Sequence, residues 1–184
     1  MPSWNSRGLR GSLLEEIINY TNTRYRDKGL ALIQKVPTPI TPINIDKEHR
    51  HITLAYFEQK STVDYIGVVQ GIPVCFDAKE CAVDTFSLNN VHEHQITFMK
   101  EFERQEGIAF LLIYFRKRDI YYYLTLDRLC EFWDRAHNGG RKSFRYEELE
   151  DGYQISLQGG ACIHYLPLIQ KDLERRENAR MNSD

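Results

Sequence analysis

The stretch TVDYIGVVQGIPVCFDAK, residues 62–79, decides the fold. Gln70-Gly71 is a turn signal between two strand-like segments, so the stretch predicts a β-hairpin. Centred on this turn, the hairpin pairs residues whose numbers add to 141 and sets Asp64 opposite Asp77. Directly opposed residues have Cβ atoms about 5 Å apart, and like charges at that distance repel. Such a pair requires a cation or a raised pKa.

Lys79 belongs to the same cluster, because residues two apart on a strand point to the same face. The opposite face of the predicted hairpin is apolar and reads as a core face: Val63, Tyr65, Val69, Ile72, Val74, Phe76 and Ala78. A slip of one residue would bury the charged side chains in that core, so the register is strongly specified.

The acidic pair and the lysine form the pattern D-x12-D-x-K, which matches a nuclease motif but is weakly specific alone. An exposed ion cluster is the alternative reading. Mg²⁺ prefers oxygen ligands and keeps several waters, and it lowers the pKa of a bound water. The expected ligands are Asp64, Asp77, the Ala78 carbonyl and Thr62, with Mn²⁺ as a substitute metal. Lys79 would position the attacking water.

Two further residues are ambiguous. Ser12-Leu-Leu-Glu15 is a capping-box pattern at the start of a predicted helix, so Glu15 either caps that helix or reaches the metal as a third carboxylate. Gln95 lies on the apolar stripe of a helix predicted over residues 91–106, where a polar side chain needs a partner. That partner is either a backbone carbonyl or the active site.

The composition indicates one globular domain over residues 1–184, with 42% hydrophobic residues and a net charge of −2. The slight acidity counts against nucleic-acid binding unless the basic residues are locally clustered. The longest apolar run, residues 108–115, is far short of a membrane span, and the N-terminus does not resemble a signal peptide. Four scattered cysteines fit structural thiols in a reducing compartment. We therefore expect a cytoplasmic protein with no membrane partner.

The predicted order of elements is helix, arm, hairpin, helix, strand pair and helix, which defines an α/β fold with a mixed central sheet flanked by helices. Three prolines in residues 37–42 favour an extended, polyproline-like backbone, and residues 37–53 are interpreted as a projecting stalk. Lys47 and Arg50 in this arm, and Arg141 and Lys142 after two glycines, are either solvated loop residues or phosphate contacts.

The chain resembles the RecU family of Holliday-junction resolvases in a series of motifs that spans nearly its whole length. The matching segments are Arg10-Gly11, Leu14-Glu15-Glu16, Thr21-Asn22, Lys35 with Pro37-Thr-Pro39, Ala55-Tyr56-Phe57, Ser61-Thr62 through Asp64-Tyr65, Phe76-Asp77-Ala78-Lys79-Glu80, His92-Glu93-His94-Gln95-Ile96, Phe132-Trp133-Asp134-Arg135 and Gly140-Arg141-Lys142-Ser143. The series is far more specific than the D-x12-D-x-K pattern.

The resemblance implies a restriction-endonuclease-like fold, a homodimer, Mg²⁺ dependence and paired symmetric nicks in four-way junction DNA. It assigns catalysis to the acidic pair and lysine, a catalytic glutamate to Glu15, and DNA contacts to Arg10 and Lys35. Two positions depart from the family pattern. Asp77 stands where members carry Glu, and Lys47 stands where Arg is expected, which loses bidentate phosphate contact.

The sequence therefore predicts a Mg²⁺-dependent Holliday-junction resolvase acting in recombination and DNA repair. Recombinase or branch-migration proteins are its expected protein partners. One alternative is a nuclease of the same fold that acts on other branched or duplex DNA. A second alternative is a junction-binding recombination factor that does not cleave.

Overall fold

The computed structural model describes residues 13–57, 62–158 and 162–182. Its elements are α1 (Leu13–Asp27), β1 (Leu32–Lys35), β2 (Ile40–Asp46), β3 (His51–Phe57), β4 (Tyr65–Val69), β5 (Ile72–Cys81), β6 (Thr85–Ser87), the 3₁₀ turn η1 (Leu88–Asn90), α2 (Glu93–Arg104), β7 (Ile108–Phe115), β8 (Ile120–Thr125), α3 (Leu126–His137), β9 (Ser143–Arg145), η2 (Tyr146–Glu148), β10 (Gln154–Ile155), β11 (Leu157–Gln158), β12 (Cys162–Ile163) and α4 (Leu166–Met181).

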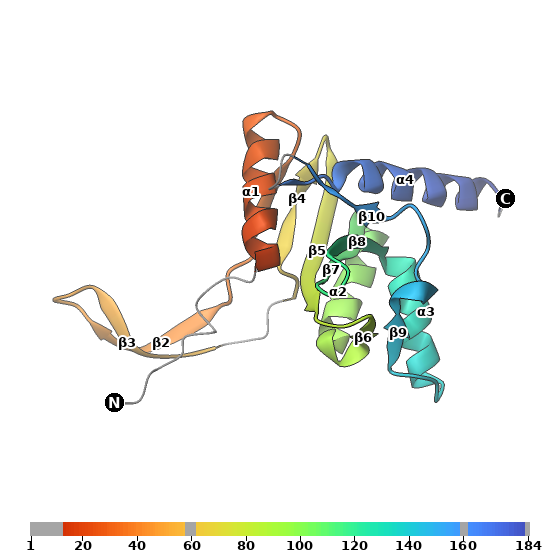
Figure 1. The fold of residues 1–184 in the computed structure, drawn as a ribbon. Helices are drawn as coiled ribbons and strands as arrows, with labels where there is room; N and C mark the ends of the chain where they lie inside the picture. The colour runs from red at the N-terminus through yellow and green to blue at the C-terminus, as the bar shows by residue number, and fades with distance from the viewer. Residues whose placement is uncertain (1–12, 58–61, 159–161, 183–184) are drawn as a thin grey trace.

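A central sheet organises the molecule. Within the described residues it has six strands in the order β1-β4-β5-β7-β8-β10. β5 and β7 are parallel, and the other neighbours are antiparallel. Helix α2 makes the crossover that parallel neighbours require. Figure 1 shows α1 on one side of the sheet and α2 and α3 on the other. The predicted mixed α/β class is confirmed.

The β4–β5 hairpin has the register expected from residues 62–79. Tyr65 pairs with Phe76, Ile66 with Cys75 and Val69 with Ile72. Gly71 at the turn has φ +91°, a left-handed conformation that glycine adopts without strain. Alternation along β5 points Phe76 toward α1 and Asp77 toward α2.

Aromatic stacking crosses the core on the α1 side of the sheet. Tyr65, Phe76, Phe110 and Tyr123 stack in sequence, with ring centroids 4.8, 4.7 and 4.2 Å apart. All eight residues of β7 are buried, as its unbroken apolar sequence predicts. The aromatic stack therefore fixes β4 firmly against β5, and with it the position of Asp64.

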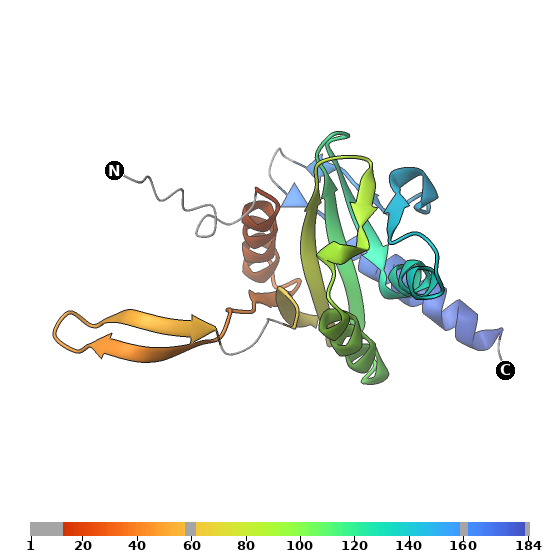
Figure 2. The same ribbon diagram turned by 90° about the horizontal axis from the view of Figure 1, so that it is seen from below.

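The predicted arm is a β-hairpin in which β2 and β3 pair from Ile40–Phe57 to Asp46–His51. It leaves the body on the side of α1 and extends away from the sheet (Figures 1 and 2). The prediction placed it over residues 37–53 with a polyproline-like backbone. Instead, Pro42 lies inside a paired strand next to a bulge, and the hairpin runs to Phe57. We call residues 40–57 the stalk.

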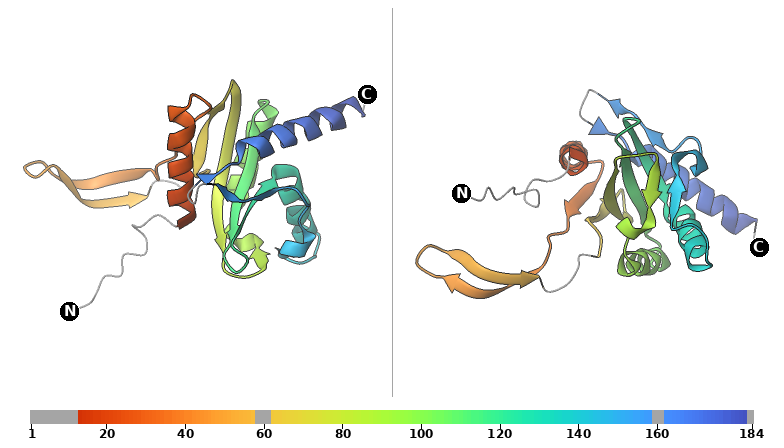
Figure 3. Two further views of the ribbon diagram at one scale, coloured as in Figure 1. Left: turned by 45° about the horizontal axis from the view of Figure 1, so that its top comes forward. Right: turned by 60° about the horizontal axis from the view of Figure 1, so that its bottom comes forward.

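The C-terminal segment forms the helix α4, which lies on the opposite side of the molecule from the stalk (Figure 3). It is held by Asp172, which is fully buried and accepts hydrogen bonds from Tyr123, Arg175 and Arg176. None of the helices in the described ranges is long and apolar enough to cross a lipid bilayer.

Candidate active site

The β4–β5 hairpin brings Asp64 and Asp77 together through two reciprocal hydrogen bonds. The Asp64 backbone N–H donates to Asp77 Oδ1 at 2.9 Å, and the Ala78 backbone N–H donates to Asp64 Oδ2 at 2.9 Å. β4 begins at Tyr65, so beyond Phe76 these bonds replace the strand ladder. The predicted opposition of the two carboxylates is therefore present.

Asp77 is more enclosed than its sequence suggested. The alternative reading was an exposed ion cluster, but Asp77 is 0% exposed because α2 covers that side of β5. Its Oδ2 accepts from Gln95 Nε2 at 2.8 Å and lies 2.5 Å from Lys79 Nζ. A buried carboxylate needs such donors, since an unpaired buried charge is costly.

Gln95 has two partners, neither of which is the backbone carbonyl considered above. Its Oε1 accepts the His92 backbone N–H at 3.0 Å, which caps the start of α2, while its Nε2 donates to Asp77. These two bonds fix the orientation of the amide. The first turn of α2 therefore holds Asp77 in place.

The electrostatics of the pair favour a cation. Burial, together with the negative charge of Asp77, raises the pKa of Asp64 from 3.8 to about 6, although Ala78 N–H and Lys79 oppose the shift. Lys79 thus offsets only part of the repulsion. A divalent ion would stabilise both ionised carboxylates.

The donor set fits a hard metal ion. Asp64 is only partly buried, and both acids supply oxygen ligands. The described residues contain no cluster of three or more acidic, histidine or cysteine side chains that could hold a metal. A cation here would therefore complete its shell with backbone oxygen and water, as Mg²⁺ commonly does. The Ala78 carbonyl is adjacent to the pair. Thr62 is exposed and lines a separate hollow with His94 and Phe98.

Glu15 is not placed with the acidic pair. It lies on α1, which covers the other face of β5, and its carboxylate bonds Lys35 Nζ at 2.8 Å. Lys35 is thereby partly neutralised as a candidate DNA contact. The capping partner Ser12 lies outside the described residues. Instead, Glu80 accepts the Leu14 backbone N–H in the first turn of α1 at 3.1 Å, a long-range contact that no local pattern predicted.

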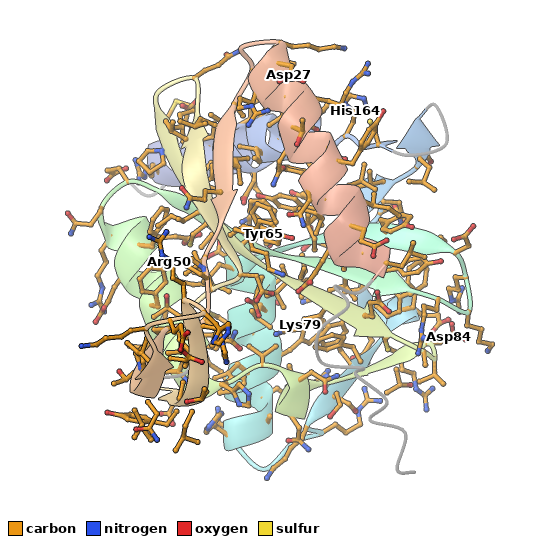
Figure 4. The ribbon with its side chains drawn as sticks, turned by 90° about the vertical axis from the view of Figure 1, so that its left-hand side faces the viewer. Asp27, Arg50, Tyr65, Lys79, Asp84 and His164 are labelled. Atoms are coloured by element: carbon orange, nitrogen blue, oxygen red, sulfur yellow. The ribbon has the colours of Figure 1, made fainter. Side chains whose placement is uncertain are left out.

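The other predicted DNA contacts are dispersed. Lys47 and Arg50 are exposed at the end of the stalk, and Figure 4 shows Arg50 on the stalk and Lys79 in the body of the molecule. Arg141 pairs with Glu148 at 3.1 Å, whereas Lys142 lines a cavity beside α3. Arg10 lies outside the described residues.

The mixed sheet, the buried Asp77 beside the partly buried Asp64, and the adjacent lysine describe an α/β protein with a candidate nuclease site. The model of the family described as RecU, Recombination protein U, matches residues 9–171. The chain belongs to this family.

Curated relatives of the chain match its sequence over most of its length. It is 43% identical over 172 residues to the Holliday junction resolvase RecU of Pediococcus pentosaceus, covering 91% of this chain and 86% of that protein. The Bacillus subtilis protein of the same name is 41% identical over 175 residues, covering 92% and 82%. The solved structure of Archaeoglobus fulgidus Hjc, a Holliday junction resolvase, aligns with a TM-score of 0.39 and 9% identity over 64% of this chain and 78% of that one.

Proposed function

We propose that the protein is a Mg²⁺-dependent endonuclease that resolves Holliday junctions by paired symmetric nicks during recombination and repair. The relatives that share about two fifths of its residues are named Holliday junction resolvases. The observation that carries the proposal is the cluster of Asp64, Asp77 and Lys79, in which two opposed carboxylates share one lysine. This cluster distinguishes a cleaving enzyme from a factor that only binds junctions.

Each residue of the cluster has a separate role. Asp64 and Asp77, with the Ala78 carbonyl, would hold Mg²⁺ or, as a substitute, Mn²⁺. When bound, the ion polarises the phosphoryl oxygen and lowers the pKa of an attacking water. Lys79 donates hydrogen bonds to a phosphate oxygen or to the water and balances developing negative charge. Gln95 keeps Asp77 oriented, since it is fixed from both ends.

A homodimer is supported by the stalk. The stalk carries apolar side chains on both of its strands: Ile45 pairs with Ile52, and Leu54 and Tyr56 follow along β3 beyond a register shift. These four side chains are 43 to 57% exposed. A two-stranded hairpin is marginal in water unless an apolar face is covered. We propose that the stalks of two protomers cover each other, which presents two like sites to two like strands.

DNA contacts follow from this arrangement. Lys47 and Arg50 at the exposed end of the stalk would meet phosphates at the junction centre, and Arg141, Lys142, Lys35 and Arg10 would contact the arms. Phosphate contacts of this kind position the protein on the DNA but do not recognise the base sequence. A nucleoid-associated, cytoplasmic location and contacts with recombinase or branch-migration proteins complete the proposal.

A plasmid carrying an extruded cruciform tests the proposal. With Mg²⁺, paired nicks across the junction linearise the plasmid, whereas unpaired nicks only relax it. We expect wild type and Asp151→Asn, an exposed-acid control, to produce linear DNA, and Asp77→Asn to produce none. Wild-type protein that binds the cruciform but leaves it uncut in Mg²⁺ and Mn²⁺ would refute the proposal in favour of a binding factor.

The stalk separates the resolvase from a nuclease of other specificity. Deleting residues 39–51 should abolish cruciform cutting while leaving any nicking of linear duplex. The deletion preserves the site, because Asp64 and Asp77 are held by β4, β5 and α2. Junction resolution that survives the deletion would instead favour a nuclease acting on other branched or duplex DNA.

A further inference from the structure

A cavity of about 490 Å³ opens between η1, the start of α2 and the end of α3. It is lined among others by the following six residues: Leu88, Val91, His92, Trp133, His137 and Lys142. Its volume lies within the range of about 300 to 1,000 Å³ that is typical of small-molecule sites. The assigned catalytic cluster does not use this cavity.

The lining combines an apolar floor, an aromatic wall and a cation. Leu88 and Val91 are buried, and the Trp133 ring is partly exposed and flanked by His137 at a centroid distance of 5.1 Å. The exposed Lys142 forms no ion pair within the described part of the chain, whereas its neighbour Arg141 is bonded to Glu148. An indole beside an available ammonium group matches a base and its phosphate.

The cavity is connected to the catalytic acids. His92 contributes to its wall, and the His92 backbone N–H is held by Gln95, whose amide also holds Asp77. Two hydrogen bonds, one from His92 to Gln95 and one from Gln95 to Asp77, therefore link the cavity wall to the acidic pair. A group seated in the cavity would therefore contact a residue whose backbone is bonded to the amide that orients Asp77.

We propose that this cavity receives an unpaired nucleobase of the cut strand, which stacks on Trp133 while its phosphate meets Lys142. The inference rests on the proposed function, because the crossover of a four-way junction is where a base leaves its stack at the lowest cost. Asn89 and Glu93 at the rim supply oxygen acceptors for an exocyclic amino group. The cavity would thereby contribute to the choice of cleavage position.

Trp133 fluorescence provides a readout that is independent of cleavage. The chain has two tryptophans, so a Trp4→Phe background leaves Trp133 as the sole indole. In EDTA, where no cutting occurs, the emission of Trp133 should fall as a four-way junction saturates the protein. The arms supplied as linear duplex should leave its emission and its acrylamide accessibility nearly unchanged.

Paired variants separate stacking from packing. Trp133→Phe keeps an aromatic face and should retain junction affinity, whereas Trp133→Leu keeps apolar volume only and should weaken binding about tenfold. Lys142→Ala should lower the slope of log affinity against log salt by about one. Lys28→Ala, an exposed lysine after α1, should not change it. Thermal melts confirm that each variant is folded.

The outcomes distinguish this inference from the proposed function. If junctions bind and are cut while Trp133 emission does not change, or if Trp133→Leu binds as well as Trp133→Phe, the nucleobase site is refuted and the resolvase stands. If no variant binds junctions at all, the proposed function itself fails.

Discussion

Ionising Asp64 is less favourable in the folded protein than in the unfolded chain. Its folded pKa of about 6 exceeds the ordinary value of 3.8 because of burial and the charge of Asp77. The folded protein therefore binds more protons than the unfolded chain between these values. The contribution of Asp64 to the free energy of unfolding is therefore greatest below about pH 4, and it falls as the pH rises to about 6.

Replacing Asp64 by Asn should stabilise the metal-free protein while abolishing cleavage. The shift corresponds to a gain on the order of 2–3 kcal/mol at pH 7 and almost none at pH 4. Urea denaturation in EDTA at both pH values measures this gain in the free energy of unfolding, with Asp151→Asn as the control. A gain of the same size at both pH values would show that the Asp64 charge is not its source.

Gln95 should matter to catalysis although it touches no substrate in the proposed mechanism. Gln95→Leu removes the donor to Asp77, and losing a group that orients a metal ligand typically costs about 10- to 100-fold in metal affinity or activity. We expect the Mg²⁺ concentration for half-maximal cleavage to rise, while Thr97→Ala on the exposed side of α2 leaves it unchanged. An unaltered Mg²⁺ dependence would exclude this role.

The alternation of side chains along the hairpin predicted which charged residues share a face, but it did not predict which of them are buried or what they contact. Asp64, Asp77 and Lys79 were found because alternation of period two is a local property. The burial of Asp77 depends on α2, sixteen or more residues later in the chain, and the Glu80 contact depends on α1. The bond between Glu15 and Lys35 is equally long-range, so the local capping pattern around Glu15 did not indicate it.

At the scale of elements, α4 depends on one buried acid. Asp172 is fully buried between Tyr123, Arg175 and Arg176, and Arg176 also pairs with Glu103 on α2. Asp172→Ala would leave the Tyr123 hydroxyl without its acceptor and would remove the carboxylate that Arg175 and Arg176 share. Breaking a buried pair in this way costs about 3–5 kcal/mol.

Chemical denaturation of Asp172→Ala beside Glu174→Ala, an exposed acid of the same helix, measures this cost. We expect a large loss of unfolding free energy only for Asp172→Ala. Equal losses would mean that the charge of α4, and not its buried anchor, governs stability.

Long elements were predictable and short ones were not. Periodicity over ten or more residues identified α1, α2 and α3, and the unbroken apolar run identified β7. Strands β6, β9 and β12 contain two or three residues each, too few to show a period. The stalk was recognised from its prolines, but its strand pairing was not, because alternating exposed apolar residues in an arm have no core to face.

At the scale of the whole molecule, the exposed apolar face of the stalk should govern assembly. We expect sedimentation velocity to show a dimer for the wild type and a monomer for Ile52→Ser/Leu54→Ser. Cruciform linearisation should be lost in the double variant, since paired cuts need two sites. Thr53→Ala, at an exposed polar residue of the same strand, is the control. A double variant that remains dimeric would move the interface elsewhere.

Strand β5 continues for five residues beyond the last residue paired with β4. Past Phe76 its only strand partner among the described residues is β7, so the candidate catalytic acids lie at a flank where the paired strands of the sheet end. A long ligand can reach such a site from the flank of the sheet where β5 is no longer paired with β4. A stiff polymer can pass along the flank without threading through the protein, and it can leave the same way after both strands are cut.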